Sequence, residues 1–108
     1  MPKAPRMPCV RVAEIKIDPA HRDAYAAALR EQIETAVRVE PGALALHAAS
    51  DKNDPARIIV FEIYADVDAY ETHLETPHFR TYKAATAHMV TSLTLIEAFP
   101  IALAAKAM

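Results

Sequence analysis

Residues 73–83 hold the densest group of side chains in this sequence that can move protons or bind anions. The segment reads His-Leu-Glu-Thr-Pro-His-Phe-Arg-Thr-Tyr-Lys, so two histidines, a tyrosine, an arginine and a lysine surround one proline. An imidazole changes its charge near neutral pH, which makes histidine a frequent general acid or base. We therefore expect this segment to line a pocket in which a proton is transferred.

Two histidines and a tyrosine of this segment are the first catalytic candidates. In a helix that starts at Pro77, His78 and Tyr82 are four residues apart and can share one face. Together they could take a proton from a bound hydroxyl, or they could lie at a helix–sheet seam with their polar tips in water. His73 could face the same pocket, or it could cap the end of a preceding short helix, where the helix dipole favours a charged ring.

Glu62 is a catalytic candidate because it lies in the apolar run 57–64. On a strand it shares a face with Tyr64 and with two aliphatic side chains. Burial among such neighbours raises the pKa of a carboxyl group, which is one way to make a general acid or base. The alternative is an ion pair with Arg11 or Lys16 on the adjoining first strand, or with a second subunit.

His47 and Arg11 are weaker candidates, since each alternates with small or apolar residues on a predicted strand. Either side chain could point into the pocket or lie at its rim. The sequence has no His-Glu-x-x-His spacing and a single glycine, Gly42, so it predicts no metal site and no phosphate loop for a nucleotide or flavin. Cys9 is expected to be a small buried residue and not a nucleophile.

The composition indicates one globular domain. Of the 108 residues, 53% are hydrophobic and 24% are charged, and the net charge is -2. The sequence lacks a basic face for nucleic acid, an apolar stretch of about 20 residues for a membrane span, and the apolar centre of a signal peptide. A single cysteine favours a reducing cytoplasm. We expect a flexible arm at residues 1–8, the domain at 9–100 and a tail at 101–108.

Apolar periodicity and turn residues predict the elements that must position these side chains. Strands are expected at residues 9–17, 43–50, 57–64 and 91–99, and helices at 19–39, 67–75 and 77–89. The order β-α-β-β-α-β makes the fold class α+β and ferredoxin-like, with a four-stranded antiparallel sheet and helices on one face.

Three local features refine this arrangement. The alternation of residues 9–17 slips near Ala13, which predicts either a β-bulge or partial burial of both faces. Gly42 follows Glu40-Pro41, and we expect the long helix to stop here in a sharp bend, because proline removes a donor and glycine tolerates a positive φ. The strand at 57–64 is apolar on both faces and belongs in the middle of the sheet. Because the last two strands keep apolar residues on the uncovered face, we expect a homodimer that packs sheet against sheet.

Three stretches of the chain resemble a known family. They are His73-Leu-Glu-Thr-Pro-His78-Phe, the preceding strand end Phe-Glu62-Ile-Tyr64, and the turn Val39-Glu-Pro-Gly42. With the order of elements, they resemble the antibiotic biosynthesis monooxygenase domain over about residues 10–99, and most of all the small bacterial quinol monooxygenases. The resemblance implies a dimeric α/β barrel with a pocket between the sheet and the helices of each subunit.

The resemblance also implies an activity, the oxidation of a quinol-like or phenolic aromatic by O₂ without metal or flavin. A deprotonated quinol is itself a strong reductant, so the protein need supply only a base, a dry pocket and charge stabilisation. The residues expected to be catalytic are His73, His78, Tyr82 and Glu62, and those expected to contact the substrate are His47, Tyr64, Phe79 and Arg11. No cofactor is expected, and the partners are a small aromatic substrate, O₂ and a second copy of the chain.

Departures from the family pattern leave other functions open. Haem-degrading and polyketide-oxidising relatives use an asparagine and a tryptophan, whereas this chain has no tryptophan and its only asparagine is Asn53, in a predicted loop. Their chemistry is therefore not expected here. Relatives that isomerise a phosphorylated sugar derivative carry a similar segment, and that reaction would need a phosphate site such as Arg80 or Lys83. The third alternative is a non-catalytic dimeric module that binds a small ligand.

Overall fold

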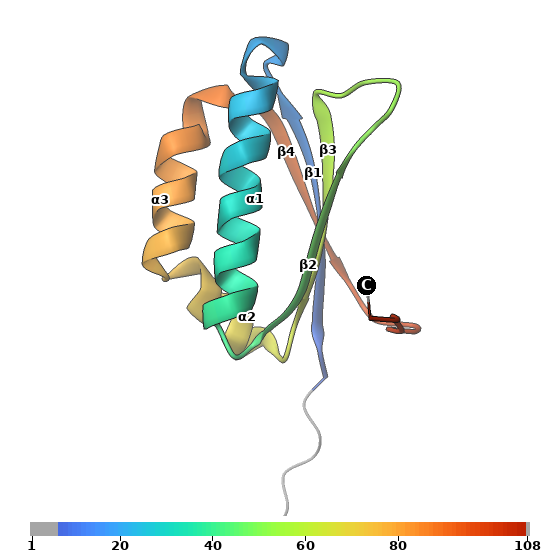
Figure 1. Ribbon diagram of the computed structural model, residues 1–108. Coiled ribbons are helices and arrows are strands. Elements are labelled where there is room, and N and C mark those ends of the chain that lie inside the picture. Colours follow the sequence, from blue (N-terminus) through green and yellow to red (C-terminus); the bar gives the residue numbers. More distant parts are fainter. Residues whose placement is uncertain (1–6, 108) are drawn as a thin grey trace, which may run out of the picture.

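A four-stranded antiparallel sheet with helices on one face forms the protein. The computed structural model describes residues 7–107, so most of the arm predicted at residues 1–8 lies outside the described residues. The elements are β1 (Cys9–Ile17), α1 (Arg22–Val39), β2 (Ala43–Ser50), β3 (Arg57–Tyr64), α2 (Val67–Leu74), α3 (Pro77–Thr86) and β4 (Val90–Ala98), with single 3₁₀ turns at Pro19–His21 and Ala87–Met89. The strand order is β2-β3-β1-β4, and α1 and α3 lie side by side (Figure 1). The predicted ferredoxin-like order of elements is confirmed.

The two central strands are β3 and β1, which confirms that residues 57–64 lie in the middle of the sheet. One cross-strand row on the helix-facing side joins Leu46, Glu62, Arg11 and Glu97, in that order from β2 to β4. The row places Glu62 at the centre of the sheet, directly under the helices.

Strand β1 has no bulge at Ala13. Its pairing with both neighbours is continuous there, and the irregularity in its pairing with β4 lies between Lys16 and Ile17. Val10 and Ala13 point to opposite faces, because side chains alternate along a strand, and they are 4% and 5% exposed. Of the two predicted explanations for the slip in alternation, partial burial of both faces is the correct one.

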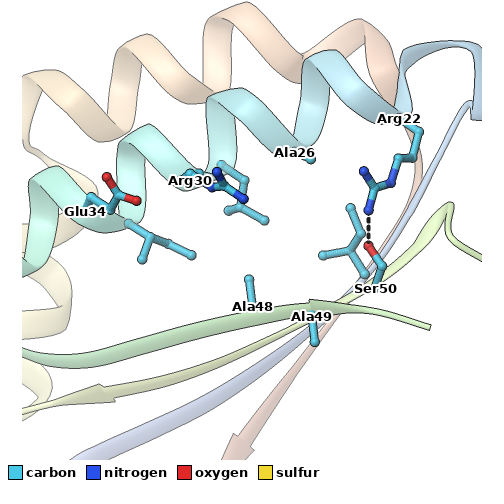
Figure 2. Close-up of a pocket in the computed structure, with 10 residues that line it drawn as sticks. Arg22, Ala26, Arg30, Glu34, Ala48, Ala49 and Ser50 are labelled. Atoms are coloured by element: carbon cyan, nitrogen blue, oxygen red, sulfur yellow. Dashed lines mark hydrogen bonds between the residues drawn. The ribbon is translucent and has the colours of Figure 1, made fainter. Parts of the chain in front are cut away.

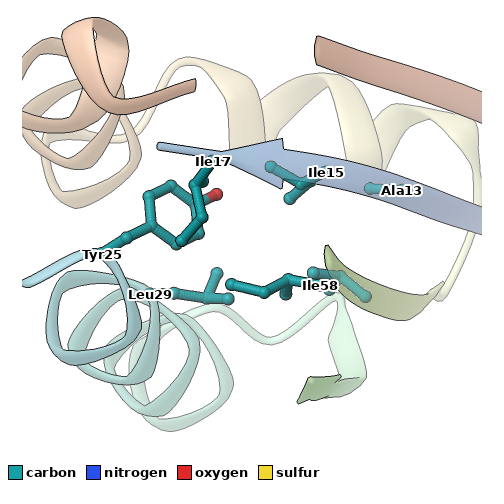
Figure 3. Close-up of a cluster of buried hydrophobic side chains, with 7 residues drawn as sticks. Ala13, Ile15, Ile17, Tyr25, Leu29 and Ile58 are labelled. Atoms are coloured by element: carbon teal, nitrogen blue, oxygen red, sulfur yellow. The ribbon is translucent and has the colours of Figure 1, made fainter. Parts of the chain in front are cut away.

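The main core lies between α1 and the middle of the sheet. Tyr25 and Leu29 of α1 pack with Ile15 and Ile17 of β1 and with Ile58 of β3 (Figure 3). All five side chains are buried. Because apolar burial of this kind is the main stabilising term in folding, this cluster fixes the position of α1 over β1 and β3.

Gly42, in the turn between α1 and β2, is required by close packing. Its φ is not positive, so the position does not use the tolerance of glycine for that conformation. A Cβ atom at this position would lie 2.4 Å from the Cβ atom of Ala69 in α2. The missing side chain therefore allows α2 to approach the end of α1, where Glu40 lies.

A break at Thr76-Pro77 separates α2 from α3, as the sequence predicts. Asp66 caps the start of α2, and the Thr76 side chain accepts a hydrogen bond from the Phe79 amide at the start of α3. The Thr76 hydroxyl also donates to the His73 carbonyl at 2.8 Å. One side chain thus joins the last turn of α2 to the first turn of α3, and Pro77 occupies a position that needs no amide hydrogen.

The sheet face opposite the helices carries apolar side chains. One cross-strand row on this face joins His47, Phe61, Val12 and Ile96, from β2 to β4. Phe61 is 38% exposed and Ile96 is 41% exposed. Within residues 7–107, no helix is both long enough and apolar enough to cross a bilayer.

Candidate active site

A mainly apolar cavity of about 290 Å³ lies between the helices and the sheet. Helices α1, α2 and α3 contribute one side of its lining, and all four strands contribute the other. Its polar lining consists of Gln32, Glu62, Tyr70, Tyr82 and Lys83. An apolar cleft with a few polar groups is the usual form of a site for a small organic molecule. We refer to it as the central cavity.

A second cavity, of about 310 Å³, lies between α1 and β2 (Figure 2). Its polar lining includes Arg22, Arg30, Glu34 and Ser50, and Arg22 donates a hydrogen bond to the Ser50 hydroxyl at 3.0 Å. None of the residues that the sequence predicts to be functional lines this second cavity. The central cavity is therefore the candidate active site.

Glu62 reaches the central cavity from β3. Burial raises the pKa of its carboxyl group, and the hydrogen bond from Tyr64, with the nearby His73 and Arg11, offsets this only in part. The Tyr64 hydroxyl donates to Glu62 Oε1 at 2.5 Å. Burial and the adjacent Glu62 charge raise the pKa of Tyr64, so that phenol keeps its proton and remains a donor. Glu62 is thus a carboxylate with increased basicity, held in place by a neutral tyrosine.

Gln32 of α1 brings an unpaired acceptor to the same cavity. Its side chain lines the cavity, the residue is 7% exposed, and its Oε1 atom has no hydrogen-bond partner among the described residues. Most buried polar side-chain atoms have a partner, because an unpaired acceptor costs about 1–3 kcal/mol. A hydroxyl group on a bound molecule would supply the missing donor.

Tyr82 and Phe79 of α3 give the central cavity an aromatic wall. Their ring centroids are 6.0 Å apart, and both residues line the cavity. The Tyr82 hydroxyl is hydrogen-bonded to the Tyr25 hydroxyl. Burial raises the pKa of both phenols, so they stay neutral and Tyr82 is not a base near neutral pH. The two rings instead offer a surface against which a flat aromatic molecule can pack.

His73 and His78 meet at the carboxylate of Glu40, at the end of α1. His73 Nδ1 lies 2.9 Å from Oε2 and 3.1 Å from Oε1, and His78 Nε2 lies 2.5 Å from Oε2. A carboxylate only accepts hydrogen bonds, so each imidazole donates its N–H to Glu40. Neither histidine lines the central cavity, but the His73 ring centroid is 4.8 Å from that of Phe79 and 5.3 Å from that of Tyr64. The cluster therefore lies directly behind the cavity wall.

The two basic residues considered as ion-pair partners of Glu62 bind elsewhere. Arg11 binds Glu97 at 2.8 Å and lines a separate groove beside the end of β4. Lys16 lies 3.5 Å from Asp54. The hydrogen-bond partner of Glu62 is Tyr64 instead. Among residues 7–107 no cation is in direct contact with the carboxylate, which explains why its pKa stays raised.

The remaining sequence candidates are dispersed. His47 is exposed and lies on the opposite face of the sheet, beside Phe61. Arg80 is exposed and forms an ion pair with Glu75. Lys83 is the one member of the proposed phosphate pair that lines the central cavity. Phosphate groups are usually bound by several charged or backbone donors, so this lining does not favour a phosphorylated substrate.

The sequence did not reveal Glu40 and Gln32 as functional candidates. Glu40 is 33 and 38 positions from its two histidine partners, and its local sequence indicates only a turn. Gln32 falls on the buried stripe of α1, where a polar side chain among apolar ones is the available signal. Both residues acquire their role from contacts between distant parts of the chain.

The sequence and the structure were compared with those of known proteins. Residues 8–85 match the family described as antibiotic biosynthesis monooxygenase. A crystal structure from Bacteroides thetaiotaomicron, of a protein provisionally assigned as an antibiotic biosynthesis monooxygenase, is 43% identical over 94% of this chain and 97% of that one, with a TM-score of 0.89. A search of curated proteins found no match.

Two further structures extend the likeness. A Lactobacillus acidophilus protein, provisionally assigned as a monooxygenase, is 26% identical over 86% of this chain and 44% of that longer one, with a TM-score of 0.81. PA3566 from Pseudomonas aeruginosa is 23% identical over 93% of this chain and all of that one (100%), with a TM-score of 0.84, and shows the same fold.

Proposed function

Because this chain belongs to the antibiotic biosynthesis monooxygenase family, we propose that it is a cofactor-independent monooxygenase that oxidises a quinol-like aromatic in the central cavity. The observation that carries this proposal is the pairing of Glu62, a partly buried carboxylate with a raised pKa, with an apolar cavity that has an aromatic wall. The cavity suits a flat apolar molecule, and Glu62 suits a molecule whose hydroxyl must lose a proton.

Glu62 acts as the base in this proposal. It takes the proton of one quinol hydroxyl, and the resulting quinolate is a much better electron donor to O₂ than the neutral quinol. Tyr64, hydrogen-bonded to Glu62 Oε1, keeps the carboxylate oriented toward the cavity. A positioned general base of this kind contributes about 10²–10⁴-fold to a rate.

The reaction balances without an external reductant. One oxygen atom of O₂ forms a bond to a ring carbon and replaces its hydrogen, and the other oxygen atom leaves as water. O₂ accepts four electrons, two from oxidation of the quinol to the quinone and two from conversion of the ring C–H bond to a C–O bond. The protein's part is to deprotonate the substrate, to hold it, and to keep water away from the reduced oxygen species.

Gln32 would bind the second hydroxyl of the quinol. Its unpaired Oε1 atom is buried at the α1 side of the cavity, and Glu62 comes from the sheet side. A molecule with a hydroxyl at each end would satisfy both acceptors, whereas an aromatic with a single hydroxyl would leave one of them unpaired. Aromatic molecules that lack the second hydroxyl should therefore bind less tightly.

His73 and His78 are positioning residues in this proposal. Their bonds to Glu40 hold the end of α2 and the start of α3, next to Leu74 and Phe79 of the cavity lining.

We also propose that the protein is a homodimer, through the apolar sheet face that contains Phe61. The single cysteine is consistent with function in the cytoplasm.

Oxygen uptake tests the proposed activity. Protein treated with a chelator is mixed with a panel of hydroquinones in an oxygen electrode, beside Glu62→Gln and the control Glu34→Gln, whose exposed carboxylate lies at the second cavity. The wild type and Glu34→Gln should consume O₂ well above the rate of autoxidation, and Glu62→Gln should not. Uptake at the autoxidation rate for every hydroquinone would exclude the proposed function.

A further inference from the structure

We infer that Glu40, His73 and His78 form a binding site for one divalent transition-metal ion, best suited to Zn²⁺, outside the central cavity. The ligand atoms are one imidazole nitrogen from each histidine and one carboxylate oxygen of Glu40, and they all lie within 4.8 Å of one another. Two imidazoles and one carboxylate are a ligand set that zinc takes in proteins.

The distances between these atoms are close to those that an ion requires. Zinc binds imidazole nitrogen and carboxylate oxygen at about 2.0–2.2 Å, so neighbouring ligand atoms in a tetrahedral site are about 3.3 Å apart. The two nitrogens lie 2.9 Å and 2.5 Å from Glu40 Oε2, and His73 Nδ1 also lies 3.1 Å from Oε1. To admit the ion, each nitrogen would move away from Oε2 by less than about 1 Å, and the two nitrogens, which lie within 4.8 Å of each other, would settle about 3.3 Å apart.

The surroundings of the cluster allow both binding and access. The side chains of His73 and Glu40 are 2% and 9% exposed, so an ion would be largely shielded from water, while that of His78 is 18% exposed and gives a route from solvent. His78 lies in the first turn of α3 and is less buried than His73, so its side chain has more room to adjust. The carboxylate, facing His73 with both oxygens, can supply a fourth coordinating atom.

Ion binding would replace two hydrogen bonds with coordination. Without an ion, each imidazole donates its N–H to Glu40. With an ion, those two nitrogens must be unprotonated, so each ring carries its hydrogen on the other nitrogen. Protons and metal therefore compete for the same atoms.

The position of the site assigns it a structural role. Its ligands come from three segments, namely the end of α1, the last turn of α2 and the first turn of α3. The residues that follow the two histidines, Leu74 and Phe79, line the central cavity. An ion would hold these segments together and stiffen that wall, while the oxidation itself takes place at Glu62 and does not involve the ion.

Metal titration tests this inference independently of activity. Chelator-treated protein is titrated with Zn²⁺ by calorimetry and with Co²⁺ by visible absorption, whose intense bands report tetrahedral coordination. We expect about one ion per chain, the tetrahedral Co²⁺ spectrum, and a higher Tm with Zn²⁺. Loss of a residue that only supports a metal ligand costs about 10–100-fold in affinity, so His78→Gln, which removes a ligand, should weaken binding by at least about 100-fold.

Matched variants exclude other histidine sites. His21 and His88 lie near each other on the surface, with ring centroids 5.1 Å apart, so the double variant His21→Gln/His88→Gln is the control and should bind as the wild type does. Binding that is lost in this control, or that persists in His78→Gln, would overturn the inference. So would the absence of stoichiometric binding to the wild type, a result that needs no variant to fold.

Discussion

Glu62 has the two properties that a catalytic base in an apolar cavity needs. Its raised pKa makes it a stronger base than an exposed glutamate, and its bond from Tyr64 keeps it in one orientation. Strand alternation was sufficient to place it among apolar neighbours, so this part of the site was predictable from the sequence. Glu40 was not, because nothing local indicates that a residue in a turn will meet two histidines from the second half of the chain.

Glu62→Gln should separate activity from stability. The variant keeps the shape and can still accept the Tyr64 hydroxyl, but it cannot take a proton, so kcat/KM should fall by about 10²–10⁴-fold. In the wild type, kcat/KM should rise with pH through the pKa of Glu62, above the ordinary value for a glutamate, and Glu62→Gln should lack that rise. An unchanged profile in the variant would remove Glu62 from the mechanism.

The same variant should alter the pH dependence of stability. Because the pKa of Glu62 is higher in the folded protein than in the unfolded chain, the folded state binds the proton more tightly. The free energy of unfolding therefore falls as pH rises from the unfolded pKa to the folded one. Glu62→Gln does not undergo this loss, so in urea denaturation its stability relative to the wild type should be greater at neutral pH than near about pH 4. A constant difference would contradict the raised pKa.

Gln32→Leu should also exchange function for stability. Leucine removes the unpaired buried acceptor, so the free energy of unfolding should increase by about 1 kcal/mol. It also removes the proposed contact to the substrate, so KM for a hydroquinone should rise by about 3- to 10-fold. The monomethyl ether of the same hydroquinone is the control. It lacks the second hydroxyl and cannot form the quinone, so it is measured as a competitive inhibitor, and its inhibition constant should change little. An equal effect on both compounds would argue against the proposed contact.

At the scale of elements, the turn after α1 connects the fold to the site. Its position was predictable, because Pro41 and Gly42 end a helix. The reason for a glycine at this position was not predictable. Gly42 makes room for the Cβ of Ala69, which is 27 positions further along the chain, and only the packing of α2 brings the two residues together. The break between α2 and α3 was predictable in the same local sense, because Thr76 and Pro77 are sufficient to cap and start a helix.

Gly42→Ala should destabilise the protein by about 1–3 kcal/mol, because the new Cβ overlaps that of Ala69 where the turn packs against α2. The double variant Gly42→Ala/Ala69→Gly relieves this contact. Its loss of stability, measured by urea denaturation, should therefore be smaller than the sum of the two single losses, even though glycine within a helix costs about 1 kcal/mol. If the two single losses were simply additive, the overlap between these two Cβ atoms would not be the cause of the destabilisation.

At the scale of the whole molecule, the sequence was sufficient for the order of elements and for the family. Alternation, caps and turn residues are local signals, and here they agree with one another along the chain. The central cavity was only implied, because its lining comes from all three helices and all four strands. Which of the candidate side chains reach the cavity depends on packing. His73 and His78, the first catalytic candidates from the sequence, lie behind the cavity wall.

The uncovered sheet face leads to a prediction on assembly. Phe61 lies in the row of this face that also holds Ile96, so Phe61→Lys should convert the proposed dimer to a monomer in sedimentation velocity, because it places a charge in an apolar interface. Val37→Lys is the control, since Val37 is 46% exposed on α1 and should leave the dimer intact. A monomeric wild type, or a dimeric Phe61→Lys, would contradict this arrangement.

The most direct test of the proposed activity is the fate of the two oxygen atoms. Chelator-treated protein reacts with a hydroquinone under ¹⁸O₂, and the product is analysed by mass spectrometry beside the reaction of Glu62→Gln. The account predicts a hydroxylated quinone that carries one ¹⁸O atom from O₂, formed by the wild type and nearly absent with the variant. A quinone without ¹⁸O, or labelled product formed equally by both proteins, would contradict it.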